Sequence, residues 1–331
     1  MKPPREVASG APKTKQFTVH EGNLTQGEER MNRVLLWSAI ATLVLVAIVG
    51  SKSALDAVDE DASAAQAAQQ LAAASSYWGE ITATIDWCEP NYVVSPYVAE
   101  FVNTVTNLGF VALGFFGVYA HPNLELRFVL TFLSISLVGF GSAAFHATLK
   151  WNAQLGDEVP MFFLSLCFLY LTIENDHFPV KHPRLPYALV LLLSVFVYFY
   201  TVYRFATLFQ MTWGILTTVT VFRMLLLTRK MAPKERLCFR IVTLVLLTSA
   251  GLWALEQALC HSLPWISKFQ LHGLFWHVGT AYAAYAAAAG CLYARLHQTL
   301  HQKDVCFDYL GGFLPIIRYD PFVNRFSVIN H

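Results

Sequence analysis

Long apolar segments recur along the chain and are separated by shorter polar stretches. Most are close to the length that an α-helix needs to cross a bilayer, about 20 residues. One segment stands alone near the N-terminus, and seven follow as a block. The pattern predicts an all-α integral membrane protein: a seven-transmembrane helical bundle with one additional N-terminal transmembrane helix. The predicted spans are 34–50, 97–120, 127–147, 159–174, 186–203, 207–228, 238–259 and 272–296.

The composition agrees with a membrane protein. The 331 residues are 55% hydrophobic and 14% charged, with a mean hydropathy of +0.44, which is too apolar for an ordinary soluble domain. The formal net charge of +1 gives no indication of nucleic-acid binding. The sequence shows no internal repeats of the kind expected of a transporter. The last span, 272–296, has no lysine that could hold retinal.

The distribution of Lys and Arg predicts the orientation of the bundle. These residues concentrate in the connections after the first, third, fifth and seventh spans of the block. By the positive-inside rule, those connections are cytoplasmic and the region before Tyr97 faces the lumen. The alternative for the first span is a cleaved signal peptide. The expected organisation is a cytoplasmic N-terminal segment (1–33), a transmembrane signal anchor (34–50), a luminal linker rich in Ala, Gln and Asp (51–76), the seven-transmembrane domain (77–320) and a cytoplasmic tail (321–331).

Two of the six cysteines are expected on the luminal side of this arrangement. Cys88 precedes the first span of the block, and Cys260 ends the sixth. The other four fall within spans or on the cytoplasmic side. An oxidising lumen permits a disulfide between Cys88 and Cys260, and two unrelated free thiols are the alternative.

Five polar side chains lie at the ends of three apolar spans. Counting the crossings places all five on the luminal face, although their segments are far apart in the sequence. Ionisable side chains at membrane depth are costly and are functional candidates by default. Three imidazoles with a carboxylate and a hydroxyl nearby could form a zinc site with an open position for water. This set predicts a metal hydrolase inside the bundle, and its members are Ser142, His146, Asp157, His272 and His277.

Each of these residues also has a simpler explanation when it is taken alone. Ser142 and His146 are four residues apart and share a helix face, so the hydroxyl could hold the attacking water or stabilise an oxyanion. A buried Ser can instead bond back to its own helix, and a buried His can be a satisfied bundle residue. Asp157 could be a general base, or an acid that favours the start of a helix. Their convergence on one face favours the functional explanation.

The chain resembles the alkaline ceramidase family over roughly residues 77–320. The matching motifs are short, but they occur in the family's order. They are Tyr77-Trp78-Gly79, Asp86-Trp87-Cys88-Glu89, Asn91, Glu100, Asn103-Thr104-Val105, Gly141-Ser142, His146, Thr148-Leu149-Lys150, Asp157-Glu158-Val159-Pro160-Met161, Trp253, Cys260 and Trp276-His277.

The resemblance implies a seven-helix membrane amidase of the endoplasmic reticulum or Golgi. Such enzymes use intramembrane zinc to cleave ceramide into a sphingoid base and a fatty acid. His146 and His277 would bind the zinc with a third histidine, and Ser142 and Asp157 would serve the water and the oxyanion. The family's luminal disulfide corresponds to Cys88 and Cys260. A calcium site is also implied, and its ligands correspond to Asp86, Trp87 through its carbonyl, Glu89, Asn91 and Glu100. Carboxylate, amide and carbonyl oxygens suit that cation, and an acidic luminal loop without metal is the alternative.

One feature departs from the family pattern. The family has two histidines four residues apart in its last span, whereas His272 and His277 are five apart. On a regular α-helix this spacing turns the two imidazoles roughly 140° away from each other. A π-bulge could restore a common face. Otherwise His272 could precede the regular helix, with Gly273 allowing a bend, or the site could be damaged.

Two other classes of protein are compatible with this departure. The chain could be a seven-helix lipid receptor of the progestin and adipoQ type, with a structural or vestigial metal site. It could also be a related hydrolase that acts on GPI lipids. The block from Asp86 to Glu100 favours a ceramidase. The expected partner is therefore a ceramide or another sphingolipid.

Overall fold

The computed structural model describes residues 76–319, except 232, 261, 302 and 303. Within these described residues, six helices are long and apolar enough to cross a membrane, and the chain is a multi-pass membrane protein. The predicted N-terminal segment, signal anchor, linker and C-terminal tail lie outside the described residues. The first four elements of the bundle are α3 (Phe101–Thr106), which continues almost directly into α4 (Leu108–Ala120), α5 (Leu126–Thr148) and α6 (Trp151–Glu174).

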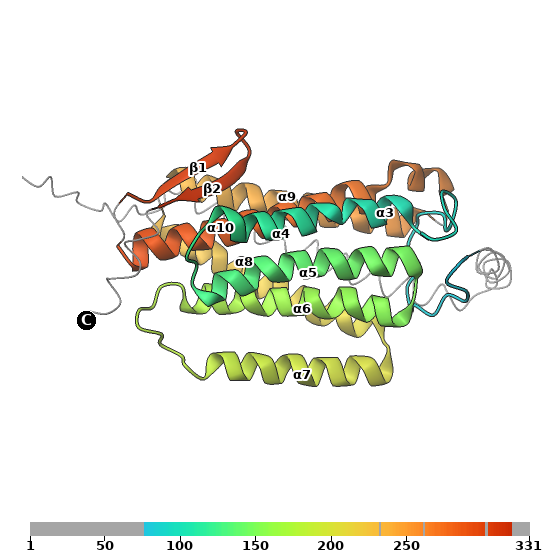
Figure 1. Cartoon of the computed structure of the whole chain (residues 1–331), viewed down its shortest axis with the longest axis horizontal. Coiled ribbons are helices and arrows are strands. Elements are labelled where there is room, and N and C mark those ends of the chain that lie inside the picture. The colour runs from blue at the N-terminus through green and yellow to red at the C-terminus, as the bar shows by residue number, and fades with distance from the viewer. Residues whose placement is uncertain (1–75, 232, 261, 302–303, 320–331) are drawn as a thin grey trace, which may run out of the picture.

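The second half of the bundle is less regular. It consists of α7 (Leu185–Tyr203), α8 (Ala206–Leu227), the 3₁₀ turn η1 (Thr228–Lys230), α9 (Pro233–Leu259), the 3₁₀ helix η2 (Pro264–Phe269), the π-helix η3 (Leu271–His277), α10 (Val278–Ala294) and the π-helix η4 (Arg295–Thr299). The helices run roughly along one common axis (Figure 1). The seventh predicted span, 272–296, is therefore built from η3, α10 and the start of η4.

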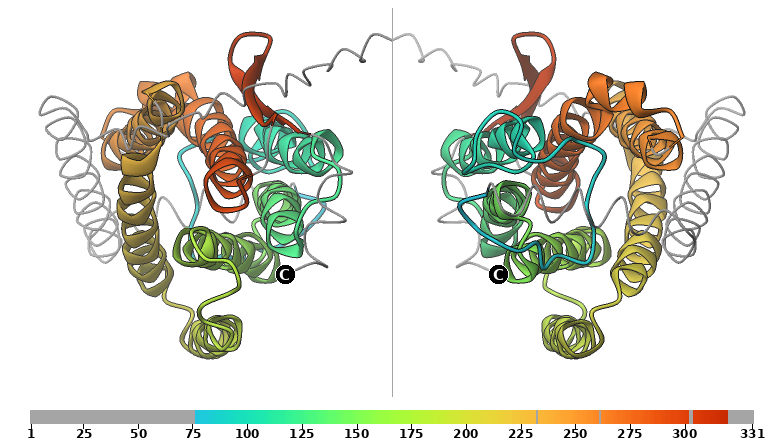
Figure 2. Two further views of the ribbon diagram at one scale, coloured as in Figure 1. Left: turned by 90° about the vertical axis from the view of Figure 1, so that its left-hand side faces the viewer. Right: turned by 90° about the vertical axis from the view of Figure 1, so that its right-hand side faces the viewer.

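Helix α10 lies among the other helices, and α7 lies outside them (Figure 2). The central position of α10 follows from its sequence, because alanine and glycine let neighbouring helices approach closely. Ala281, Ala286 and Ala289 have no exposed surface. A Cβ on Gly290 would lie 2.5 Å from the ring of Phe239 on α9. Small residues on α10 thus allow the larger side chains of its neighbours to fill the core.

Helices α5 and α6 approach each other closely near one end of the bundle. A Cβ on Gly141 of α5 would lie 1.7 Å from the carbonyl oxygen of Gly156 on α6. Only glycine at position 141 tolerates this approach of the two backbones. We name the end of the bundle that contains Gly141 and the cluster His146, His272 and His277 the site end. The contact places Ser142 and Asp157 side by side at this end.

Helix α6 begins earlier than the sequence indicated. The apolar pattern predicted a span from 159, but the helix begins at Trp151. Its first two turns contain Gln154, Asp157 and Glu158, which lowers their hydropathy although all three side chains are buried. Asp157 therefore lies inside the helix, and the explanation of Asp157 as an acid at a helix start is wrong.

A two-stranded antiparallel sheet was not predicted. Strands β1 (Cys306–Leu310) and β2 (Leu314–Arg318) pair with Cys306 opposite Arg318 and turn at Gly311 and Gly312, which both have positive φ. The hairpin packs against α10, where the Tyr285 hydroxyl donates to the Pro315 carbonyl at 2.8 Å. The backbone N–H of Ile317 donates to Nε2 of His121 at 3.2 Å. The hairpin therefore lies against the side of the bundle, near the end opposite the site end (Figure 1).

Candidate metal centre

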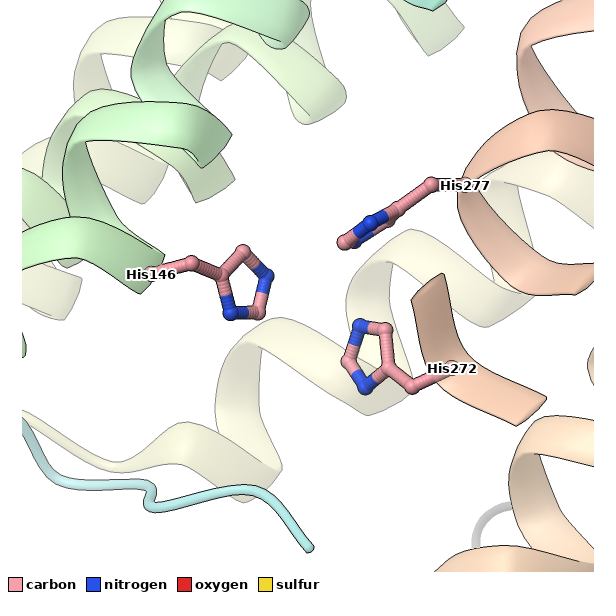
Figure 3. A group of neighbouring side chains, drawn as sticks. All are labelled: His146, His272 and His277. Atoms are coloured by element: carbon pink, nitrogen blue, oxygen red, sulfur yellow. The ribbon is translucent and has the colours of Figure 1, made fainter. Parts of the chain in front are cut away.

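Three histidines from two segments meet at the site end (Figure 3). His146 comes from the last turn of α5, while His272 and His277 come from η3. The ring centroid of His146 lies 5.1 Å from that of His272 and 4.9 Å from that of His277. The ring centroids of His272 and His277 are 4.7 Å apart. One nitrogen from each ring can be chosen so that all three lie within 4.8 Å of one another, and all three side chains are buried. Three clustered imidazoles are the donor set of a catalytic zinc site with an open fourth position.

The π-helix η3 resolves the five-residue spacing. Each turn of a π-helix holds more residues than an α-helical turn, because its hydrogen bonds run from i to i+5. His272 and His277 therefore face the same side of η3. Of the three arrangements compatible with the sequence, the structure has the π-helical one. Gly273 lies where η3 meets α3, since a Cβ there would be 3.0 Å from Oδ1 of Asn103.

Two of the three histidine rings are oriented by a polar contact to Nδ1. Nδ1 of His146 contacts the carboxylate of Glu100. Nδ1 of His277 lies 2.9 Å from Oγ1 of Thr106. Such partners fix the ring orientation and leave Nε2 for a metal. Nδ1 of His272, in contrast, has no hydrogen-bond partner among the described residues.

Sequence reasoning missed the role of Thr106. Its polar side chain within an apolar span was a signal, but a threonine there usually bonds to its own helix, as Thr106 also does through the Val102 carbonyl at 2.8 Å. Only the packing of η3 against α3 shows that the same hydroxyl reaches His277.

Ser142 and Asp157 lie beside the histidines. The Ser142 side chain lies beside the Asp157 carboxylate and interacts with it, and both side chains are buried. Oδ1 of Asp157 has no partner among the described residues. This oxygen of the carboxylate is therefore free to accept a proton from a molecule in the site.

A single cavity of about 170 Å³ joins these residues to the interior of the bundle. At the site end it is lined by the three histidines, Ser142 and Asp157. Away from them its walls are mostly apolar and reach Met224 on α8 and Phe239 on α9. A polar, metal-capable head above an apolar interior suits an amphiphile with a long hydrocarbon chain.

The segment before α3 holds the five residues that the resemblance implies as calcium ligands. Asn91 donates from Nδ2 to both carboxylate oxygens of Asp86 at 3.0 Å, and its buried Oδ1 has no described partner. The Trp87 N–H donates to Oε1 of Glu100 at 3.1 Å. The Glu89 carboxylate accepts the N–H groups of Val102 and Asn103 at 2.7 and 2.8 Å.

The carboxylates of Glu89 and Glu100 lie close enough in this segment to repel each other. Burial raises the pKa of Glu89, the backbone hydrogen bonds from Asn103 and Val102 lower it, and the nearby Glu100 carboxylate raises it. A divalent cation would relieve the repulsion between Glu89 and Glu100. The orphaned oxygen of Asn91 and this oxygen-rich donor set fit a hard cation.

A disulfide joins this segment to the residue that directly follows α9. Cys88 and Cys260 are bonded, as the expected topology indicated, and they are 172 residues apart in the sequence. The bridge fastens the segment before α3 to the connection that leads into η3. It therefore ties the two halves of the site together.

The disulfide predicts a specific alkylation pattern. Without reductant, Cys88 and Cys260 should not react with a maleimide in denaturant, whereas Cys167, Cys238, Cys291 and Cys306 should all react. Reductant should add two labels per chain, which peptide mass spectrometry would assign. Exposed Cys306 should label even in the folded protein and serves as the internal control. Labelling of Cys88 before reduction would contradict the bridge.

A family model for ceramidases matches residues 79–318. The chain is 33% identical to mouse alkaline ceramidase 3 over 262 residues, which cover 74% of this chain and 95% of the relative. The chain belongs to the alkaline ceramidase family. It is also 29% identical to an Arabidopsis thaliana alkaline ceramidase over 74% of this chain and 96% of that relative. Identity to alkaline ceramidase YPC1 of Saccharomyces cerevisiae is 53%, over 92 residues that cover 27% of this chain and 29% of that relative. Family membership makes the chain an amidohydrolase and decides against the receptor and GPI-lipid alternatives.

Proposed function

We propose that this chain hydrolyses the amide bond of ceramides to a sphingoid base and a free fatty acid, with a zinc ion bound by His146, His272 and His277. The observation that carries the proposal is the convergence of these buried histidines with Ser142 and Asp157 at the polar head of an apolar cavity. Membership of the ceramidase family supports the substrate class.

Asp157 would transfer the proton, and Ser142 would stabilise the negative charge that develops on the substrate. Zinc, when bound, would lower the pKa of a water molecule and polarise the substrate carbonyl. The Asp157 carboxylate accepts a proton from the attacking water through its free oxygen. The water oxygen bonds to the carbonyl carbon, and the Ser142 hydroxyl donates a hydrogen bond to the carbonyl oxygen as negative charge develops there. Asp157 then returns the proton to the nitrogen as the carbon–nitrogen bond breaks, which releases the amine and the fatty acid.

The segment before α3 would hold a calcium ion. The proposed ligands are Asp86, the Trp87 carbonyl, Glu89, Asn91 and Glu100. The unpartnered Asn91 oxygen and the proximity of Glu89 to Glu100 support this site. Because Glu100 also contacts His146, this cation would stiffen the support of one zinc ligand.

We also propose that the site end faces the lumen of the endoplasmic reticulum or Golgi. The Lys and Arg distribution supports this orientation. The disulfide at the site end supports an oxidising compartment on that side of the membrane.

Hydrolysis of a ceramide panel by the full-length protein in detergent tests the proposal. Mass spectrometry would follow free sphingoid base, and zinc and calcium would be determined on the same sample. Release of sphingoid base by protein that holds about one zinc per chain is expected. Zinc without turnover of any ceramide would contradict the substrate, and turnover by zinc-free protein would contradict the metal.

A further inference from the structure

Glu256 is a buried carboxylate that lies outside the catalytic residues described above. It sits on α9, one helical turn before Cys260, and its residue is 2% exposed. Its Oε2 accepts the backbone N–H of His272 at 2.8 Å, and its Oε1 accepts that of Leu271 at 3.2 Å. These are the first two residues of η3. The Glu256 side chain therefore caps the N-terminal end of the π-helix.

The start of η3 needs such an acceptor. The first N–H groups of a helix have no partner within the helix, and buried N–H groups without a partner are costly. Gln270, just before η3, adopts a left-handed conformation with φ of 49° and has no side-chain cap. A carboxylate that accepts two N–H groups forms strong, charge-assisted hydrogen bonds. Glu256 supplies such an acceptor to the first two residues of η3.

His272 relies on its backbone hydrogen bond to Glu256, whereas the other two histidines have hydrogen-bond partners on their rings. His146 and His277 are oriented through Nδ1 by Glu100 and Thr106, whereas Nδ1 of His272 has no described partner. Edge contacts with Trp87 and Trp253, at centroid distances of 4.7 and 6.4 Å, flank its ring. The hydrogen bond from its backbone to Glu256 is therefore its main polar restraint.

We propose that Glu256 is a positioning residue for His272: it holds the beginning of η3 in the register that brings His272 and His277, five residues apart, to one metal. The inference rests on the zinc site of the proposed function. The disulfide reinforces the position of Glu256, because the Glu256 carbonyl accepts the Cys260 N–H at 2.8 Å and lies 3.6 Å from Sγ of Cys88.

The variant Glu256→Gln tests the inference, and Glu174→Gln is a matched control. Glu174 is a fully buried carboxylate that accepts the N–H groups of Lys181 and His182, both at 3.0 Å, at the opposite end of the bundle. Both variants replace a carboxylate that bridges two backbone N–H groups. Only Glu256→Gln disturbs η3. A general loss of stability would therefore affect both variants, whereas a loss of positioning would affect one.

Zinc affinity is the decisive measurement. Competition with a chelator should give a zinc Kd that is about 10–100-fold weaker in Glu256→Gln than in the wild type, because loss of a supporting contact has this effect on metal sites. The Kd of Glu174→Gln should be unchanged. The absorption bands of cobalt-substituted protein should shift in Glu256→Gln alone, since they report the ligand geometry.

The outcomes separate this inference from the proposed function. Wild-type zinc affinity in Glu256→Gln, or an equal loss in both variants, would overturn the positioning role and leave the zinc site standing. Failure of the wild type to bind zinc would overturn both. If Glu256→Gln does not fold, Glu256→Asp replaces it; its shorter carboxylate cannot reach both N–H groups, so about a tenfold weaker Kd is expected. An unchanged Kd in Glu256→Asp would also count against the role.

Discussion

The substitution His146→Ala is expected to abolish zinc binding and amide hydrolysis together. It removes one of three ligands from a buried site and leaves two histidines on the single segment η3. Loss of the metal removes the activation of water and the polarisation of the carbonyl, which are worth several kcal/mol of transition-state stabilisation. Turnover should fall by at least about 10³-fold, which corresponds to about 4 kcal/mol. Zinc content and release of sphingoid base, measured on one purified sample, check the prediction.

His121→Ala is the matched control for this experiment. His121 is as buried as His146, but it lies at the opposite end of the bundle, where it accepts the Ile317 N–H. Its loss should loosen the hairpin and leave the zinc content near that of the wild type. If His146→Ala kept both zinc and turnover, the three-histidine site would be refuted.

The transmembrane helices could be predicted because their signal lies in the length of apolar segments. The predicted ends of most spans lie within a few residues of the helices, as for 127–147 against Leu126–Thr148. The signal failed for the first two turns of α6, where tertiary contacts satisfy the buried side chains of Gln154 and Glu158. Gln154, for example, donates to Oγ1 of Thr84 at 2.8 Å. Hydropathy does not register this compensation.

The hairpin escaped prediction for a similar reason. Strands of five residues carry little periodicity, and the buried positions of β2, such as Ile317, are covered by α10 and His121 rather than by a larger sheet. The paired glycines at 311 and 312 were the one local indication of a turn.

The residues of the candidate site could be predicted from the sequence, but the contacts that position them could not. Counting the crossings brought Ser142, His146, Asp157, His272 and His277 to one end, and the structure places them around one cavity. The spacing of His272 and His277 left three arrangements open, because the local sequence does not specify a π-helix. The choice among them depends on Glu256, an α9 residue 16 positions from His272 in the sequence, and on the packing of η3 against α3.

Asp157→Asn separates proton transfer from metal binding. The substitution keeps the shape of the side chain and its contact with Ser142, but the amide cannot accept and return a proton as the carboxylate does. Zinc content should therefore remain at the wild-type level while kcat falls by about 10²–10⁴-fold, the usual contribution of general acid–base catalysis. Single-turnover hydrolysis of a ceramide by the zinc-loaded variant measures the chemical step directly.

The neighbouring carboxylate provides the control. Glu158 is also buried and lines the same cavity, but its oxygens are engaged by the Tyr200 hydroxyl and by Nε2 of Gln154 at 3.2 Å. Glu158→Gln should therefore lower stability more than it lowers the rate of the chemical step. An equal loss of rate in the two variants would contradict a specific role of Asp157, because any buried carboxylate near the site would then have the same effect. A loss specific to Asp157, with zinc retained, would assign the proton transfer to its free oxygen, because in the structure that oxygen is unpaired while both Glu158 oxygens are engaged.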